Sequence, residues 1–213
     1  LASGSEAPSA EDVDIADADG DGWPDIVVAC ELAHLIYFKN PASNHRSVRW
    51  ERTIPEISLN RGSFIRVFFA DFNQDGKVEV VAANKGAENP KVKDAPLNNI
   101  SIYQLPQDPL EGSKWKELVL TQVRIPINSQ PVDLDLDGDM DIVVGSRGEK
   151  RILWLENLGN FKFTEHDINL STDIEKGSWI TGFNMDYADL NGDGRLDIVS
   201  SVWPSSVYAL FQP

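Results

Sequence analysis

Four short acidic segments of this chain carry the kinds of side chain that bind a divalent cation. Each has oxygen-bearing side chains at its first, third, fifth and ninth positions and a glycine at its sixth, directly before an apolar run. Carboxylates this close together repel one another, so a folded loop that contains them needs a counter-cation. Alternating oxygen donors around a glycine turn suit a hard cation. The predicted ligands are Asp17, Asp19, Asp21 and Asp25; Asp71, Asn73, Asp75 and Glu79; Asp133, Asp135, Asp137 and Asp141; and Asp189, Asn191, Asp193 and Asp197.

Calcium is the predicted ion, with up to four bound, and magnesium is the less favoured alternative. Calcium accepts roughly six to eight oxygen ligands in a flexible cage, whereas magnesium demands a stricter octahedron. The segments are not EF-hand loops, because the closing acid comes three residues after the glycine and a strand-like run follows. One isolated Asp-Gly-rich segment is typical of an ordinary solvated turn. Four copies in the same register favour metal binding instead.

Composition supports this interpretation and excludes several classes of function. The 213 residues carry a formal net charge of −15, which argues against nucleic acid as a partner because the phosphate backbone attracts basic surfaces. Fourteen of the acids occupy the predicted ligand positions, so four divalent ions would reduce the net charge to −7. The sequence has no run of about eighteen apolar residues that would span a membrane. Cys30 is the only cysteine, which excludes an intrachain disulfide, and we expect it to be buried.

The chain around the segments predicts an all-β fold. The first aspartates of successive segments are 54, 62 and 56 residues apart, a period typical of stacked or radial units such as the four-stranded blades of a propeller. A short strand precedes each segment, a β-branched run follows it, and an aromatic strand comes third. A charged outer strand is expected in three units, and the fourth unit lacks it. The sequence therefore predicts one β-propeller region, 1–213, of four-stranded antiparallel blades. Three blades are complete and the fourth is partial, at about 12–56, 62–121, 125–170 and 177–213.

The acidic segment followed by Asp-Ile-Val-Val resembles the FG-GAP or VCBS repeat, the calcium-binding blade of integrin-α-like β-propellers. This resemblance covers nearly the whole chain. It implies that the residue at position seven offers its backbone carbonyl to calcium. Such propellers commonly have about seven blades, so it also implies further blades from the same or another chain. We expect the second segment to be the weakest site, because Asn73 lacks a charge and Glu79 has a longer arm, and we expect the Asp139 side chain to face solvent. The position-seven residues are Trp23, Lys77, Asp139 and Arg195.

A ligand site is expected at the end of the blades opposite the acidic segments. In an antiparallel blade, the connections between second and third strands and the links between blades lie at that end, and loops on a rigid scaffold commonly carry binding residues. Packing between blades is the alternative explanation for the tryptophans. No catalytic residue is assigned, because the histidines lack a neighbouring nucleophile motif. The candidate ligand-binding residues are Glu31, His34, Lys85, Arg147, Trp179 and Trp203.

The leading functional hypothesis is a non-catalytic, secreted or cell-surface module that is stabilised by calcium and binds a carbohydrate or protein ligand. One alternative is a polysaccharide-active enzyme, similar to a lyase or a dehydratase, with its site opposite the calcium loops. Another alternative is a structural assembly unit.

Overall fold

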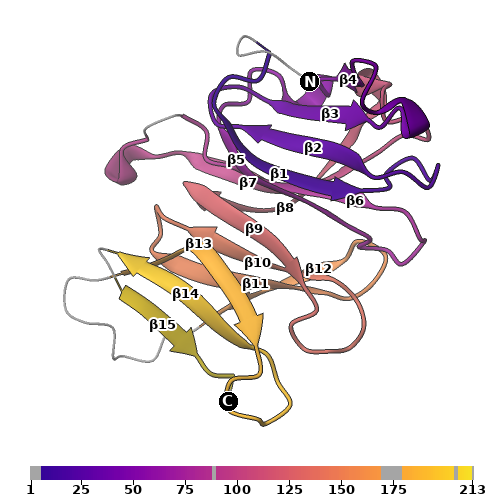
Figure 1. The fold of residues 1–213 in the computed structure, drawn as a ribbon. Helices are drawn as coiled ribbons and strands as arrows, with labels where there is room; N and C mark the ends of the chain where they lie inside the picture. Colours follow the sequence, from indigo (N-terminus) through magenta and orange to yellow (C-terminus); the bar gives the residue numbers. More distant parts are fainter. Residues whose placement is uncertain (1–5, 88–89, 169–178, 204–205, 213) are drawn as a thin grey trace.

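Each acidic segment is a loop that joins two antiparallel strands. The computed structural model describes residues 6–87, 90–168, 179–203 and 206–212. Within them, strands form four antiparallel sheets that follow one another from the N-terminus to the C-terminus (Figure 1). Short 3₁₀ turns lie in four connections: η1 (Ala42–Asn44), η2 (Glu56–Ser58), η3 (Val92–Asp94) and η4 (Gly112–Lys114). None of the described helices has the length and apolarity needed to cross a membrane.

The strands follow sequence order within every sheet. Sheet 1 contains β1 (Ala10–Ala16), β2 (Asp25–Cys30), β3 (Leu35–Lys39) and β4 (Glu51–Thr53). Sheet 2 contains β5 (Phe64–Ala70), β6 (Glu79–Asn84), β7 (Leu97–Gln104) and β8 (Lys116–Arg124). Sheet 3 contains β9 (Pro126–Val132), β10 (Asp141–Ser146), β11 (Arg151–Asn157) and β12 (Phe163–Asp167). Sheet 4 contains β13 (Trp179–Ala188), β14 (Asp197–Trp203) and β15 (Ser206–Leu210).

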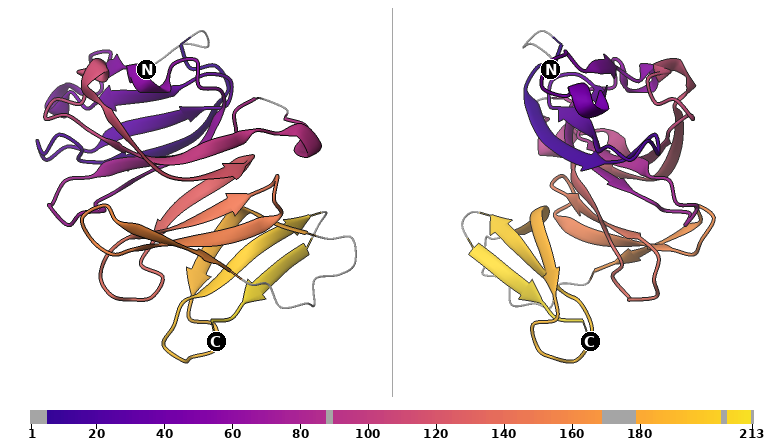
Figure 2. Two further views of the ribbon diagram at one scale, coloured as in Figure 1. Left: turned by 180° about the vertical axis from the view of Figure 1, so that it is seen from behind. Right: turned by 45° about the vertical axis from the view of Figure 1, so that its right-hand side comes forward.

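This arrangement confirms the predicted propeller-like blades, three complete and one without its outer strand among the described residues. The first strands of successive sheets lie next to one another, and the sheets fan out from them (Figure 2). The total number of blades in a closed ring stays a prediction. The boundary predicted between 170 and 177 falls outside the described residues.

The β-branched runs form the second strands of the sheets, and these strands are buried on both faces. In β6 and β10 every residue is buried, and in β2 only Ile26 is not fully buried. Cys30, at the end of β2, is buried as predicted. A strand that is buried on both faces has a continuous apolar sequence, and here the neighbouring sheets bury it.

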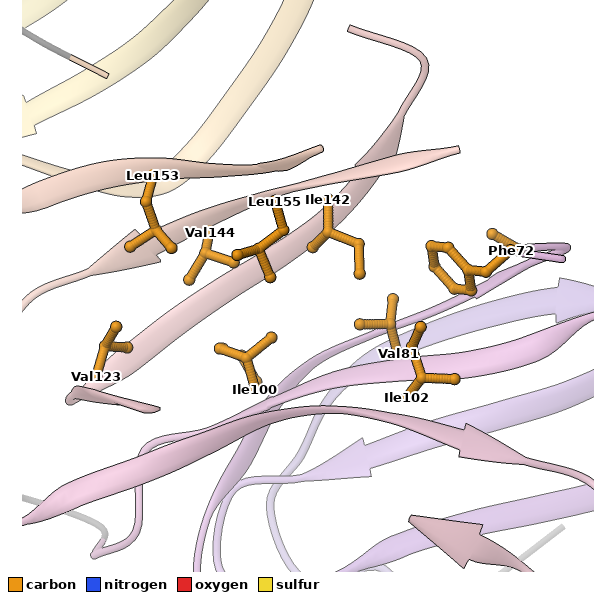
Figure 3. Packing of buried hydrophobic residues seen from close by; sticks show 11 residues of the cluster. Phe72, Val81, Ile100, Ile102, Val123, Ile142, Val144, Leu153 and Leu155 are labelled. Atoms are coloured by element: carbon orange, nitrogen blue, oxygen red, sulfur yellow. The ribbon is translucent and has the colours of Figure 1, made fainter. Parts of the chain in front are cut away.

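The packing between sheets 2 and 3 is an example of how neighbouring sheets bury these strands. Val81 of β6 and Ile100 and Ile102 of β7 lie opposite the apolar face of sheet 3 (Figure 3). Each fully buried side chain of this kind contributes about 1.5–3 kcal/mol relative to an exposed one. Sheet 3 contributes Ile142, Val144, Leu153 and Leu155 to the same cluster.

The neighbouring first strands are joined by side chains. Asp12 of β1 accepts a hydrogen bond from the Val67 backbone N–H (3.1 Å), and Asp14 accepts one from Phe69 N–H (2.7 Å). Arg66 of β5 donates to Asp12 (3.4 Å) and to Asn184 of β13 (2.8 Å). The bonds to Asp12 and Asp14 satisfy two backbone N–H groups of β5, and the Arg66 bonds join β5 to β1 and β13 through side chains.

Every first strand departs from regular pairing near its start. The register with the second strand shifts around Glu11 in β1, Ile65 in β5 and Ile127 in β9. In β13 the irregularity is wider and lies between Ile180 and Met185. A bulged residue lies outside the ladder, so its side chain can be aimed differently from those of its neighbours.

We predict that Gly145→Ala destabilises the protein. A Cβ atom at Gly145 in β10 would lie 2.5 Å from the carbonyl oxygens of both Thr181 and Gly182 in β13. Relieving this overlap requires sheets 3 and 4 to separate, at a cost of about 1–3 kcal/mol. Urea denaturation measures the change. The matched control is Ser201→Ala, at the equivalent position of β14, for which a change of less than about 0.5 kcal/mol is expected. An equally small effect of Gly145→Ala would contradict the close approach.

Candidate functional site

Each of the four acidic loops contains the same pattern of hydrogen bonds. In the third loop, Asp133 at position one accepts from Gly138 N–H (3.0 Å), and Asp135 accepts from Asp137 N–H (3.3 Å). Asp137 in turn accepts from Asp139 N–H (3.0 Å). The same three bonds occur in the other loops, so the carboxylates are turned inward by the backbone itself.

The sixth position of the loop has a backbone conformation that explains its glycine. Its φ lies between +83° and +98° in all four loops, a region that L-residues with a Cβ rarely adopt. Position four is also left-handed: it is glycine in the first and last loops but Gln74 (φ +59°) and Leu136 (φ +62°) in the middle two. Gln74 also donates to the Gly138 carbonyl (3.0 Å), which joins the second and third loops.

The acid at position nine attaches each loop to the sheet. Asp141 accepts from Leu134 N–H (3.1 Å) through one oxygen and from Asn157 N–H (2.8 Å) through the other. Asp25 and Asp197 make the equivalent pairs of bonds, and Asp25 also accepts from the Tyr37 hydroxyl (2.6 Å). All three are buried. Burial raises the pKa of Asp141 to about 6 and raises that of Asp25.

The second loop has a glutamate, Glu79, at position nine, where the other three loops have an aspartate. Glu79 accepts from Phe72 N–H (3.1 Å), the bond that corresponds to the first of the Asp141 pair. It is buried, and this burial raises its pKa to about 7. When the pKa of a carboxyl group lies near neutrality, protons compete more strongly with a cation for its oxygens. This is in line with the prediction that the second loop is the weakest site, which stays a prediction.

The carboxylates of the first and third loops gather closely enough to share a cation. Oxygen atoms of Asp17, Asp19 and Asp21 lie within 4.8 Å of one another, and so do those of Asp133, Asp135 and Asp137. One oxygen of Asp133 is buried and accepts no hydrogen bond in the described structure. An orphaned carboxylate oxygen beside two further carboxylates fits the ligand set of a hard cation.

The expectation that the Asp139 side chain faces solvent is wrong. The residue is half-buried, and one of its carboxylate oxygens is buried without a partner among the described residues. Burial, followed by the nearby charge of Asp137, raises its pKa. Gln74 of the second loop donates a hydrogen bond to the neighbouring residue, Gly138, a contact that the sequence pattern did not reveal.

Basic side chains already approach two of the loops. Lys39, at the end of β3, donates to Asp19 and forms an ion pair with it, and this bond raises the pKa of the Lys39 ammonium group. Arg195, at position seven of the fourth loop, pairs with Asp193 (2.8 Å), which lowers the pKa of Asp193. These side chains neutralise part of the negative charge that would attract a metal ion.

A cavity of about 610 Å³ lies at the opposite end of the sheets. The acidic loops join the end of each first strand to the start of each second strand. The cavity is lined instead by the starts of the first strands and by residues that end or follow the second strands. Its lining includes Glu11, Ile65 and Ile127, the bulged residues of β1, β5 and β9, and also Phe183 in the irregular part of β13. The four irregular strand starts therefore converge on one cavity.

The structure brings four of the six candidate ligand-binding residues to this cavity: Glu31, Lys85, Arg147 and Trp179. His34 is not among the lining residues, and its Nε2 lies 2.9 Å from the Glu6 carbonyl oxygen. Trp203 ends β14 and pairs with Trp179, but its side chain lies outside the described structure.

Sequence reasoning missed Lys150, Thr181, Phe183 and Ser201, which also line the cavity. These positions carry no repeated motif. The only available signal was their location at the predicted ligand end of the blades.

A family model described as FG-GAP-like repeat matches two parts of the chain, residues 17–82 and 133–200. Each match begins at the first aspartate of an acidic loop. Together they include all four loops, the whole of β2 and β10, β6 as far as Ala82 and β14 as far as Ser200. A comparison with individual curated proteins gives no match.

Proposed function

Because the chain belongs to the FG-GAP-like repeat family, we propose that it is a calcium-stabilised propeller module that binds a carbohydrate or protein ligand outside the cell. Repeats of this family are usually extracellular, which supports a secreted or cell-surface location. The observation that carries the proposal is the separation of two kinds of site. The acidic loops lie at one end of the sheets, and the 610 Å³ cavity lies at the other.

Calcium has a structural role in this proposal. The ion would be held by side-chain oxygens at positions one, three and five, and its charge would offset the mutual repulsion of the carboxylates among them. The buried oxygen of Asp133 that lacks a hydrogen bond supports such a role in the third loop. The acid at position nine then connects the loop to the sheet, so that ion binding in the loop stabilises the start of the second strand.

Replacement of Lys39 by methionine is predicted to increase the calcium affinity of the first loop. The ammonium group forms an ion pair with Asp19 and so competes with the ion for that carboxylate. The Lys39 side chain is about one-third exposed (33%), so solvent screens its charge and the gain in affinity should be no more than about fivefold. Calcium titration calorimetry measures the affinity. Lys91→Met, which removes an exposed charge from the connection between β6 and β7, is the matched control and should leave the affinity unchanged. An unchanged affinity of Lys39→Met would contradict the competition.

The ligand-binding part is tested by filling the cavity. The cavity falls in the size range of sites for small molecules, roughly 300–1,000 Å³. We expect the protein in calcium buffer to bind at least one class of oligosaccharide on an array of neutral and acidic sugars. Ser201→Trp should abolish this binding because the indole would occupy the cavity, while calcium binding and melting temperature stay close to those of the wild type. Retention of binding by Ser201→Trp would place the ligand elsewhere on the molecule.

A further inference from the structure

The charge of the cavity differs in sign from that of the whole protein. Three cationic side chains, Lys85, Arg147 and Lys150, line it together with two acids, Glu11 and Glu31. This excess of one positive charge occurs in a chain whose formal net charge is −15. A cavity that concentrates positive charge on an acidic protein attracts an anionic ligand, which the rest of the surface would repel. We propose that the cavity binds a sugar ring that carries a carboxylate, with Arg147 as the residue that receives the carboxylate. This inference rests on the proposed binding function.

Arg147 is the cation best placed for this role. Its backbone N–H donates to the Ile125 carbonyl (3.0 Å), which fixes the residue at the end of β10. Its side-chain Nε is buried and has no hydrogen-bond partner in the described structure. Arg147 lines the cavity, and among the described residues no hydrogen bond or ion pair engages its guanidinium, so its charge is available to a ligand there. The planar guanidinium also matches the two oxygens of a carboxylate.

The other two cations are already engaged. Lys85 is almost fully buried and forms an ion pair with Glu31, so this pair adds polarity to the cavity wall without a net charge. The Lys150 ammonium nitrogen lies 4.3 Å from the centroid of the Trp179 ring, in a cation–π contact. Lys150 therefore keeps its positive charge at the aromatic wall, where it reinforces the field around Arg147.

The remaining lining suits a sugar better than a free inorganic anion. Ile65, Ile127 and Val202 are buried and form apolar wall, and Phe183 packs against Ile65 and Ile127. Apolar and aromatic surface matches the C–H groups of a sugar ring, whereas it offers nothing to the oxygens of a phosphate or sulfate. The same cavity has hydroxyl groups, which both donate and accept, as sugar hydroxyls require. These belong to Thr181, Ser201 and Ser206.

The test compares two disaccharides that differ in one group. Cellobiouronic acid is cellobiose with a carboxylate in place of one hydroxymethyl group. Isothermal titration calorimetry of the protein in calcium buffer should give an affinity at least tenfold higher for the acid than for cellobiose, because a charge-assisted hydrogen bond is involved. Arg147→Gln should abolish this preference, and Arg147→Lys should retain part of it. The matched control is Arg46→Gln, which removes an exposed arginine after η1 and should preserve the preference.

The outcomes separate this inference from the proposed function. Equal affinities for the two disaccharides, or a preference that survives in Arg147→Gln, would overturn the carboxylate assignment and leave sugar binding in place. Displacement of cellobiouronic acid by inorganic phosphate at equal affinity would overturn the sugar part of the inference. Failure of the wild type to bind either disaccharide would overturn the inference. The carbohydrate form of the function proposed above fails separately, if the protein also binds nothing on the oligosaccharide array. Melting curves of the variants identify any that fail to fold.

Discussion

Chelation of calcium is expected to lower the melting temperature of this protein by roughly 10–20 °C. A site that is saturated a hundredfold above its dissociation constant contributes about 2.7 kcal/mol to stability, so the two loops with three clustered carboxylates contribute about 5 kcal/mol. For a chain of this length, each kcal/mol corresponds to about 2–4 °C. Without the ion, the three carboxylates of each loop also repel one another. Melting curves followed by circular dichroism, in excess calcium and in excess chelator, measure the difference.

Two variants connect this effect to the loops. Asp135→Asn removes one carboxylate of the third loop and should narrow the difference between the two melting curves. Glu56→Gln, which removes an exposed acid of η2 in the connection between β4 and β5, should leave the difference unchanged. Coincident melting curves of the wild type in the two buffers, with metal removal verified by atomic absorption, would falsify the structural role of calcium.

Asp141→Ala is expected to destabilise the protein by about 3–5 kcal/mol even in excess chelator. The carboxylate is 1% exposed and accepts hydrogen bonds from the backbone N–H groups of Leu134 and Asn157. Both of those residues are buried, so the substitution leaves two buried donors without partners, and each costs about 1–3 kcal/mol. The loop is then detached from the end of β11 as well as from β10. Urea denaturation in chelator measures the change in the free energy of unfolding.

The control for this prediction is another acid of the same loop. Asp135 is exposed, so Asp135→Ala in chelator should change the stability by less than about 0.5 kcal/mol. In calcium, both variants should be destabilised. A loss for Asp141→Ala that appears only in calcium would show that its carboxylate acts through the ion and not through its two backbone bonds.

Much of the fold could be predicted because its signals are local. The run from Ile142 to Val144 is β-branched and follows a glycine turn, and these features indicate a buried strand whatever the rest of the chain does. The left-handed φ of Gly138 follows from the loop pattern in the same way. The extension of β8 to Arg124 was not predicted, because it depends on pairing with the whole of β7.

In the candidate site, too, the features that depend on local contacts could be predicted and those that depend on contacts between sheets could not. The inward turn of Asp133, Asp135 and Asp137 results from bonds to backbone groups two to five residues away, so the sequence alone indicates it. The hydrogen bond from Gln74 to the Gly138 carbonyl joins loops of different sheets, which no local pattern reveals.

The sequence by itself determined the acidic loops and the order of strands within each sheet. Only the tertiary structure decided that Glu11, Ile65, Ile127 and Phe183 turn into one cavity beside Arg147. The physical reason is that a bulge and its direction depend on how neighbouring sheets pack. The contacts involved join residues far apart in the chain, such as Gly145 and Gly182 or Arg66 and Asn184.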